Sequence, residues 1–138
     1  MTPLFKKLNF KQQNEICILN HPSEFEAEMN DMNGYTTIRT NIDDSKDIEF
    51  VLTFVMTKAD IDNVAPDIHK KVKGDGIVWF AYPKGTSKKY KPEINRDNGW
   101  DLLGKLGFEV VRAVAIDDDW TALRFRRIEF IKTMTRKK

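Results

Sequence analysis

The sequence predicts an α/β fold: an open, three-layer sheet of about six strands with helices on both faces. The first observation lies at residues 47–84, where an apolar run, a helical pattern and a second apolar run follow one another. The run at 48–56 is almost continuously apolar, which is typical of a parallel strand buried on both faces. The second observation is C-terminal. Two strand patterns flank residues 117–119, a connection so short that it predicts an antiparallel hairpin.

The length and composition are those of a single globular domain. The chain has 138 residues, of which 41% are hydrophobic and 32% are charged, and its net charge is +2. A domain of this size buries enough surface to fold without a disulfide or a metal ion. We therefore expect one domain over residues 1–138, with 1–14 as a lid over a core edge and 131–138 as a basic, flexible tail.

The composition excludes several classes of protein. No window approaches the ~18 apolar residues of a membrane span, and the N-terminal stretch lacks the apolar region of a signal peptide. Cys17 is the only cysteine, and its apolar surroundings predict a buried, unreactive thiol. His21 and His69 belong to different elements, so no metal site is expected. We expect a cytoplasmic protein without membrane contact.

The N-terminal part predicts two strands joined by a helix. Residues 15–19 form a short, β-branched apolar run, which indicates a buried strand. Ser23 is expected to begin a helix as its N-cap, with Glu26 completing a capping box, and Gly34 is expected to end it. Residues 35–42 alternate and are rich in β-formers, which favours an edge strand.

The central part predicts a strand, a helix and a further strand. The strand at 48–56 precedes a helix capped by Thr57, in which Pro66 predicts a kink or two short helices. A Gly-Asp-Gly stop at 74–76 follows the helix, and the next strand is expected at 77–82.

The C-terminal part begins with a long polar loop at 84–94 that contains four lysines. A helix should follow, capped by Asn95 or Asp97 and ended by Gly107. The last two strands form the antiparallel pair, at residues 109–116 and 120–130.

Three segments of the second half carry a resemblance to a known fold family. Residues 73–76 make a Lys-Gly-type turn, Gly107 and Phe108 follow a helix, and residues 117–125 belong to the hairpin. In this order they resemble the Rossmann-like S-adenosylmethionine-dependent methyltransferases. The resemblance implies the strand order 2-1-3-4-6-5, with the last strand antiparallel.

The first half departs from that family. Its members end the first strand with an acidic residue and a Gly-x-Gly turn, through which the backbone approaches the cofactor. Residues 19–23 are instead Leu-Asn-His-Pro-Ser, and the acidic residue expected after the second strand could only be Asp43 or Asp44. No cofactor is therefore expected, and S-adenosylmethionine is kept only as an alternative.

A second resemblance covers most of the chain. The segments IVWFAYPKG at 77–85, R-D-x-x-W at 96–100 and AIDDDWTALRF at 115–125 are similar to a bacterial family of small, uncharacterised proteins. This resemblance implies a fold, but it brings no known activity with it.

The candidate ligand site lies beyond the carboxyl ends of the strands, where the strand order reverses. A helix N-terminus and a nearby lysine favour a small anionic ligand there. The candidate residues follow the strands or flank the polar loop: Asn20, His21, Ser23, Thr57, Tyr82, Lys84, Asp97 and Trp100. The competing interpretation is that these residues only cap helices, pack the core or carry surface charge.

The polar loop is also a candidate nucleic-acid surface, because it mixes lysines with an aromatic ring that could stack on a base. The residues concerned are Lys88, Lys89, Tyr90 and Lys91. Solubility and protection of a sheet edge explain the same lysines, and we rank that interpretation first.

The leading hypothesis is a non-catalytic binding or interaction module, because the sequence predicts an intact sheet but no catalytic set of residues. The first alternative is a small-ligand (nucleotide or anion) binding protein, or a methyltransferase-like enzyme, that uses the crevice beyond the first and third strands. Nucleic-acid binding ranks below both. A protein partner is also compatible with the sequence, which does not identify the ligand.

Overall fold

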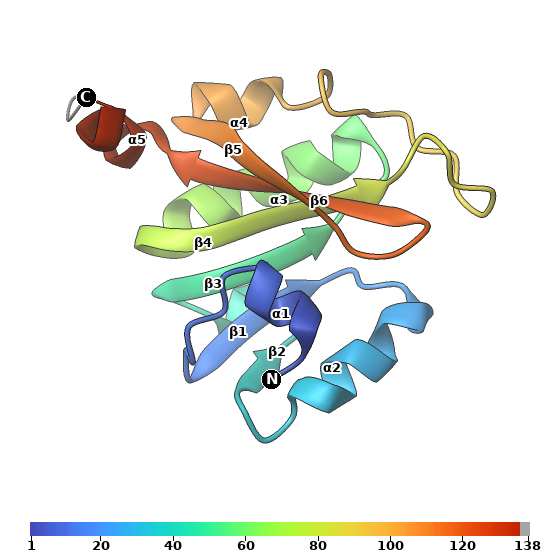
Figure 1. Cartoon of the computed structure of the whole chain (residues 1–138). Coiled ribbons are helices and arrows are strands. Elements are labelled where there is room, and N and C mark those ends of the chain that lie inside the picture. Colours follow the sequence, from blue (N-terminus) through green and yellow to red (C-terminus); the bar gives the residue numbers. More distant parts are fainter. Residues whose placement is uncertain (136–138) are drawn as a thin grey trace.

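The computed structural model describes the backbone of residues 1–135, which build a six-stranded sheet in the order β2-β1-β3-β4-β6-β5 (Figure 1). Strands β1 to β4 are parallel, whereas β6 runs antiparallel to both β4 and β5. The strands are β1 (Glu15–Leu19), β2 (Thr37–Arg39), β3 (Ile48–Phe54), β4 (Val72–Pro83), β5 (Phe108–Ala115) and β6 (Trp120–Arg127). The predicted strand order is confirmed.

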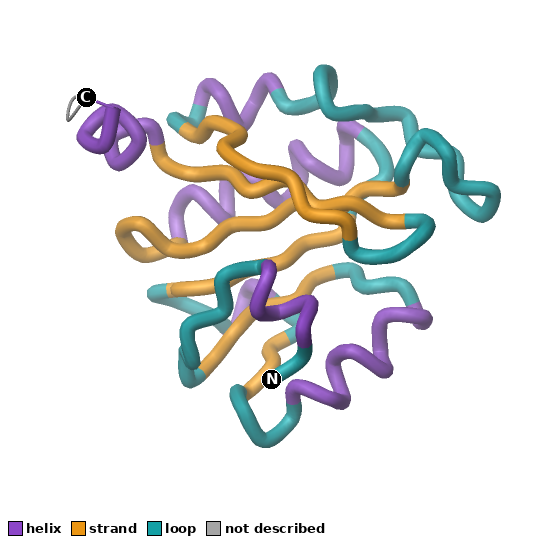
Figure 2. Tube along the Cα trace, in the orientation of Figure 1, coloured by secondary structure: helices purple, strands orange, loops and turns teal. Residues whose placement is uncertain are grey.

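Helices cover both faces of this sheet, as Figure 2 shows by colour. The helices α1 and α2 pack on one face, and α3 and α4 pack on the other. The helical segments are α1 (Pro3–Lys7), α2 (Glu26–Met32), α3 (Lys58–Lys71), α4 (Asp101–Lys105), α5 (Ile128–Thr135), and the 3₁₀ turns η1 (Ser23–Phe25) and η2 (Ile42–Asp44).

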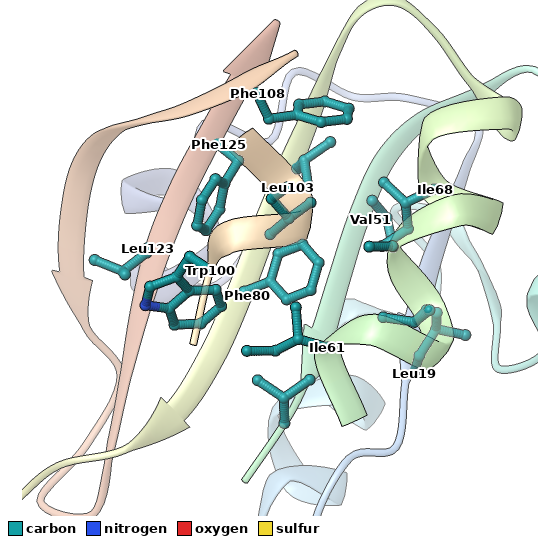
Figure 3. Packing of buried hydrophobic residues seen from close by; sticks show 14 of the residues in the cluster. Leu19, Val51, Ile61, Ile68, Phe80, Trp100, Leu103, Phe108, Leu123 and Phe125 are labelled. Carbon is teal, nitrogen blue, oxygen red and sulfur yellow. The ribbon is translucent and has the colours of Figure 1, made fainter. Parts of the chain in front are cut away.

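The sheet has an apolar core on each side because alternate side chains of a strand point to opposite faces. On β3, Val51 packs toward α3, whereas Phe50 and Leu52 pack beneath α1 and α2. Figure 3 shows the α3 side, where Phe80 and Trp100 meet. The near-continuous apolar run that predicted a central strand is therefore needed to fill both layers.

Helix α3 begins as predicted. The Thr57 hydroxyl accepts the Asp60 N–H at 3.0 Å, and the Asp60 carboxylate accepts the Thr57 N–H at 3.2 Å. Of the two alternatives expected at Pro66, two short helices is wrong, because α3 is one helix of 14 residues. Pro66 is exposed, and the buried residues Ala65 and Ile68 on either side of it hold both halves against the sheet.

Three other expectations are corrected. Ser23 does not cap a helix through its side chain; it begins the short turn η1, which Pro22 precedes. The edge strand β2 is shorter than predicted, spanning only Thr37–Arg39. No side chain caps α4: the Asn95 carboxamide accepts the Asp97 N–H in a turn of its own, and α4 starts at Asp101.

The ends of the long strands also differ from expectation. The Gly-Asp-Gly segment lies inside β4, where a Cβ at Gly76 would come within 2.9 Å of the Ile48 carbonyl oxygen. Strand β6 ends at Arg127, and α5 follows where more strand and a flexible tail were predicted. Residues 136–138 of that tail lie outside the described residues. Gly107 does end α4, in the left-handed conformation (φ 90°).

Candidate ligand-binding cleft

A cleft of about 490 Å³ lies at the carboxyl ends of β1 and β3. The strand order reverses here, because β1 is flanked by β2 on one side and β3 on the other. Open α/β sheets bind their ligands at this position. The cleft is lined by Asn20, Pro22, Ser23, Glu24, Phe54, Met56, Asp60, Lys89, Tyr90 and Trp120.

Asn20 turns the chain at the edge of the cleft. It follows the last residue of β1 and has a left-handed backbone conformation, with φ 58°. Glycine is the usual residue in that conformation, but asparagine is also enriched there. The turn leads directly into η1 and so carries Glu24 to the cleft. The sequence has no glycine here, so the turn was not predicted.

The Glu24 side chain accepts hydrogen bonds from three residues that lie far from it in the sequence. Its carboxylate accepts the Tyr90 hydroxyl at 2.7 Å, the Lys89 ammonium at 3.3 Å and the Trp120 indole N–H at 3.3 Å. The Tyr90 hydroxyl is the main reason that the pKa of Glu24 falls to about 2. Glu24 is therefore ionised at neutral pH, while 28% of its side-chain surface remains exposed.

A row of aromatic rings runs from the core to the cleft. Phe25 contacts Phe54 with ring centres 5.0 Å apart, Phe54 contacts Trp120 at 5.1 Å, and Trp120 contacts Tyr90 at 5.0 Å. The first two rings and Trp120 are buried, whereas Tyr90 is half-buried. The inner rings fix the orientation of Trp120, which in turn supports Tyr90 beside Glu24.

The lysine-rich loop is folded against the acidic turn. The Ser87 hydroxyl donates to Asp119 at 2.8 Å and accepts the backbone N–H groups of Lys89 and Tyr90. The Asp119 carbonyl oxygen accepts the Lys84 N–H at 2.8 Å. Two segments that looked like separate solvated loops therefore position Lys89 and Tyr90 together.

A second cleft, of about 530 Å³, lies on the other side of Asn20 and Asp60, which line both clefts. Its lining includes Asp43, one of the two acidic residues, Asp43 and Asp44, considered after the second strand. Asp60 is already engaged, since its carboxylate accepts the N–H groups of Met56 and Thr57. Asp43 thus offers an oxygen acceptor at the β2 side of the same sheet edge.

The structure brings part of the predicted ligand set together. Asn20 and Ser23 line the first cleft, and so do two residues proposed for nucleic acid, Lys89 and Tyr90. Lys88 and Lys91 are exposed on the loop. Glu24 and Trp120, which make the central contacts, were not among the predicted site residues.

The remaining predicted residues lie outside the lining of this cleft. His21 contacts Glu26 at 3.4 Å, Thr57 caps α3, and Lys84 is held through its backbone. Asp97 is exposed in the Asn95 turn. Tyr82 and Trp100 pack in the core on the α3 side, where burial raises the pKa of Tyr82.

Each of the three tryptophan N–H groups donates a hydrogen bond within the protein. Trp79 donates to the Leu8 carbonyl oxygen, Trp100 donates to that of Asn95, and Trp120 donates to Glu24. Each indole therefore reports on a different region of the molecule.

Two further features concern metal ions and membranes. No group of three or more His, Cys, Asp and Glu side chains suited to a metal ion occurs among the described residues. None of the described helices is long and apolar enough to cross a membrane.

Solved methyltransferases have a similar fold. A S-adenosylmethionine-dependent methyltransferase from Aquifex aeolicus superposes with a TM-score of 0.59 and 10% identity, covering 88% of this chain and 86% of its own. A Sulfolobus solfataricus protein assigned to the type 11 methyltransferases superposes with a TM-score of 0.57 and 13% identity, covering 91% of this chain and 92% of its own. The N-methyltransferase NodS from Bradyrhizobium japonicum superposes with a TM-score of 0.51 and 11% identity, covering 82% of this chain and 73% of its own. These matches show a Rossmann-like, methyltransferase-like fold.

No protein-family model and no curated protein matches the chain. The resemblance to small bacterial proteins therefore stays an expectation.

Proposed function

We propose that this chain is a ligand-binding domain that holds a small organic cation with a flat ring system in the first cleft. The observation that carries the proposal is the Glu24 carboxylate, with a pKa of about 2, beside the rings of Tyr90 and Trp120. A cation gains from a carboxylate and from aromatic faces at once. The cleft is lined by two carboxylates, Glu24 and Asp60, and by one ammonium group, Lys89, which contacts Glu24 at 3.3 Å. This excess of negative charge favours a cation over the anion that the sequence suggested.

S-adenosylmethionine is the leading candidate, since it joins a sulfonium cation to an adenine ring. Glu24 would face the positive charge, and Trp120 and Tyr90 would lie beside it. The Asn20 turn stands where the family has its glycine turn, and Asp43 offers an acceptor for hydroxyl groups. Both clefts have the size of small-molecule sites, roughly 300–1,000 Å³. When bound, this molecule would supply an activated methyl group.

We further propose that the domain acts by binding rather than by catalysis. A general base needs a pKa near the working pH, and Glu24, at about 2, is far below it. The carboxylate of Asp60 accepts two backbone N–H groups. The Tyr90 hydroxyl donates to Glu24, and this hydrogen bond raises the pKa of Tyr90.

Calorimetric titration with S-adenosylmethionine and S-adenosylhomocysteine tests the proposal, because the second molecule lacks the sulfonium charge. We expect S-adenosylmethionine to bind about tenfold more tightly, a difference of about 1.4 kcal/mol. Glu24→Gln should remove this preference, while Glu26→Gln, which removes an exposed carboxylate nearby, should retain it.

Two results would contradict the proposal. Equal affinities for the two molecules, or no binding of either, would contradict a cation site. Mass spectrometry would detect S-adenosylhomocysteine formed during incubation with candidate methyl acceptors, and its formation would show methyl transfer in place of binding alone.

A further inference from the structure

Two arginines lie side by side on the sheet, away from the clefts. In the register of the sheet, Arg124 on β6 stands between Trp79 on β4 and Arg112 on β5. The register of β5 shifts between Val110 and Arg112, so that Arg112 rather than Val111 is the partner of Arg124. Such irregularities commonly re-aim a side chain near a functional site. This one places Arg112 and Arg124 opposite each other on neighbouring strands.

Arg124 has an unsatisfied donor. Its side chain is half-buried, and its Nε atom is buried with no hydrogen-bond partner among the described residues. Burial is the main reason that the pKa of Arg124 is lowered; the charge of Asp75 acts against this, and the charges of Arg126 and Arg112 lower the pKa further. A buried donor without a partner is unfavourable, so it indicates a bound water or ion.

The neighbouring charges do not satisfy Arg124. Asp75 is held by Arg126 through two short hydrogen bonds, at 2.9 Å and 2.7 Å. Glu109 stands opposite Arg126 rather than opposite Arg124. Arg112 donates to Asn9, whose carboxamide carries no charge, at 3.1 Å.

Glu129, on α5, is the one acidic residue that follows Arg124 in the sequence. Residues 132–138 contain neither aspartate nor glutamate. The pair formed by Arg112 and Arg124 therefore carries two positive charges, and no ion pair to a carboxylate is formed by either within the described part of the chain.

We propose that Arg112 and Arg124 form a binding site for a phosphate group. Guanidinium groups bind phosphate oxygens through paired, charge-assisted hydrogen bonds, and two adjacent guanidiniums suit a doubly charged oxyanion. The site is separate from the cleft, because Arg124 follows Trp120 by four residues, roughly 13 Å along an extended strand. It does not depend on the function proposed for the cleft.

The test is a titration of the whole protein with inorganic phosphate, at an ionic strength kept constant with chloride. We expect the Arg124 Nε–H resonance to shift in the NMR spectrum and the melting temperature to rise by about 2 °C. Arg124→Met should lose the phosphate-dependent rise, while its melting temperature without phosphate stays at least as high as that of the wild type. Arg96→Met, which removes the same charge from an exposed loop, should respond like the wild type.

Two results of the phosphate titration would overturn the proposal. The first is a wild-type protein whose Nε–H resonance and melting temperature do not change with phosphate. The second is a rise in melting temperature in Arg124→Met that equals that of the wild type. If Arg124→Met does not fold, the Nε–H resonance of the wild type decides alone.

The source of the phosphate is distinguished by a second titration with single-stranded RNA of increasing length. Affinity that rises with length and falls steeply with salt would identify a nucleic-acid backbone. Affinity that stays at the level of inorganic phosphate would identify a small phosphorylated molecule. Either result supports the site itself.

Discussion

Glu24 and Arg124 are two charged residues on the same side of the sheet, but their surroundings are opposite. Glu24 accepts hydrogen bonds from three side chains, two of which belong to the loop at 84–94. Arg124 has a buried Nε without a partner in the described chain. The comparison teaches that internal partners fix the Glu24 carboxylate in position at the cleft, whereas the Nε of Arg124 keeps a donor that no described side chain uses.

The largest change in the free energy of unfolding should come from Trp120, whose ring lies beside Glu24. Trp120→Ala removes the contacts with Phe54 and Tyr90, and it should lower the free energy of unfolding by about 3–5 kcal/mol. Trp120→Phe keeps an aromatic ring and loses the indole N–H, so this variant should lower the free energy of unfolding by only about 1 kcal/mol. Urea denaturation measures both, and equal losses would contradict the packing role of Trp120.

A smaller effect is expected from the satisfied arginine next to Arg124. Arg126→Met breaks the paired hydrogen bonds to Asp75, and it should lower the free energy of unfolding by about 1–2 kcal/mol. The same measurement on Arg124→Met provides the matched control on one strand. An equal loss of free energy of unfolding in the two variants would contradict a difference between the hydrogen bonding of Arg126 and that of Arg124.

The pH dependence of stability should single out Glu24. Hydrogen bonds lower its pKa from 4.5 in the unfolded chain to about 2 in the folded protein. The stabilisation is therefore complete above about pH 4.5 and is lost as the pH falls through about 2. Glu24→Gln should be less stable than the wild type by about 1 kcal/mol at pH 7, and the difference should vanish near pH 2. A difference that does not change with pH would contradict this account.

The smallest effect should come from Arg124 itself. Replacing an unsatisfied, half-buried guanidinium by an apolar side chain of similar length removes the desolvation penalty. Arg124→Met should therefore change the free energy of unfolding by less than about 1 kcal/mol, toward greater stability, in phosphate-free buffer. A loss of stability as large as that of Arg126→Met would show that Arg124 has an internal partner.

The fold was predictable because its signals are local. The apolar run at 48–56, the Thr57 cap and the short acidic turn at 117–119 each depend on a few neighbouring residues, and they predict the central strand, its helix and the hairpin. The strand order came from the resemblance to methyltransferases, and the structure has the same order. Pro66 was misjudged because packing against the sheet outweighed the loss of one helical hydrogen bond.

The site was harder to predict because its contacts are not local. Glu24 is 66 residues from Tyr90 and 96 residues from Trp120, and only the fold brings them together. Asn20 was a predicted site residue, but its left-handed turn was not predicted, because glycine is the usual residue in that conformation. An asparagine directly after the first strand is the signal for this turn, since asparagine is enriched in the left-handed region.

The measurement that tests the cleft most directly is the NMR spectrum of the three indole N–H groups during titration with S-adenosylmethionine. Trp120 donates to Glu24 in the cleft, while Trp79 and Trp100 donate to backbone carbonyl oxygens elsewhere. We expect the Trp120 resonance to shift in a saturable manner and the other two to stay in place. A shift of Trp79 or Trp100 with an unchanged Trp120 would contradict a ligand site beside Glu24.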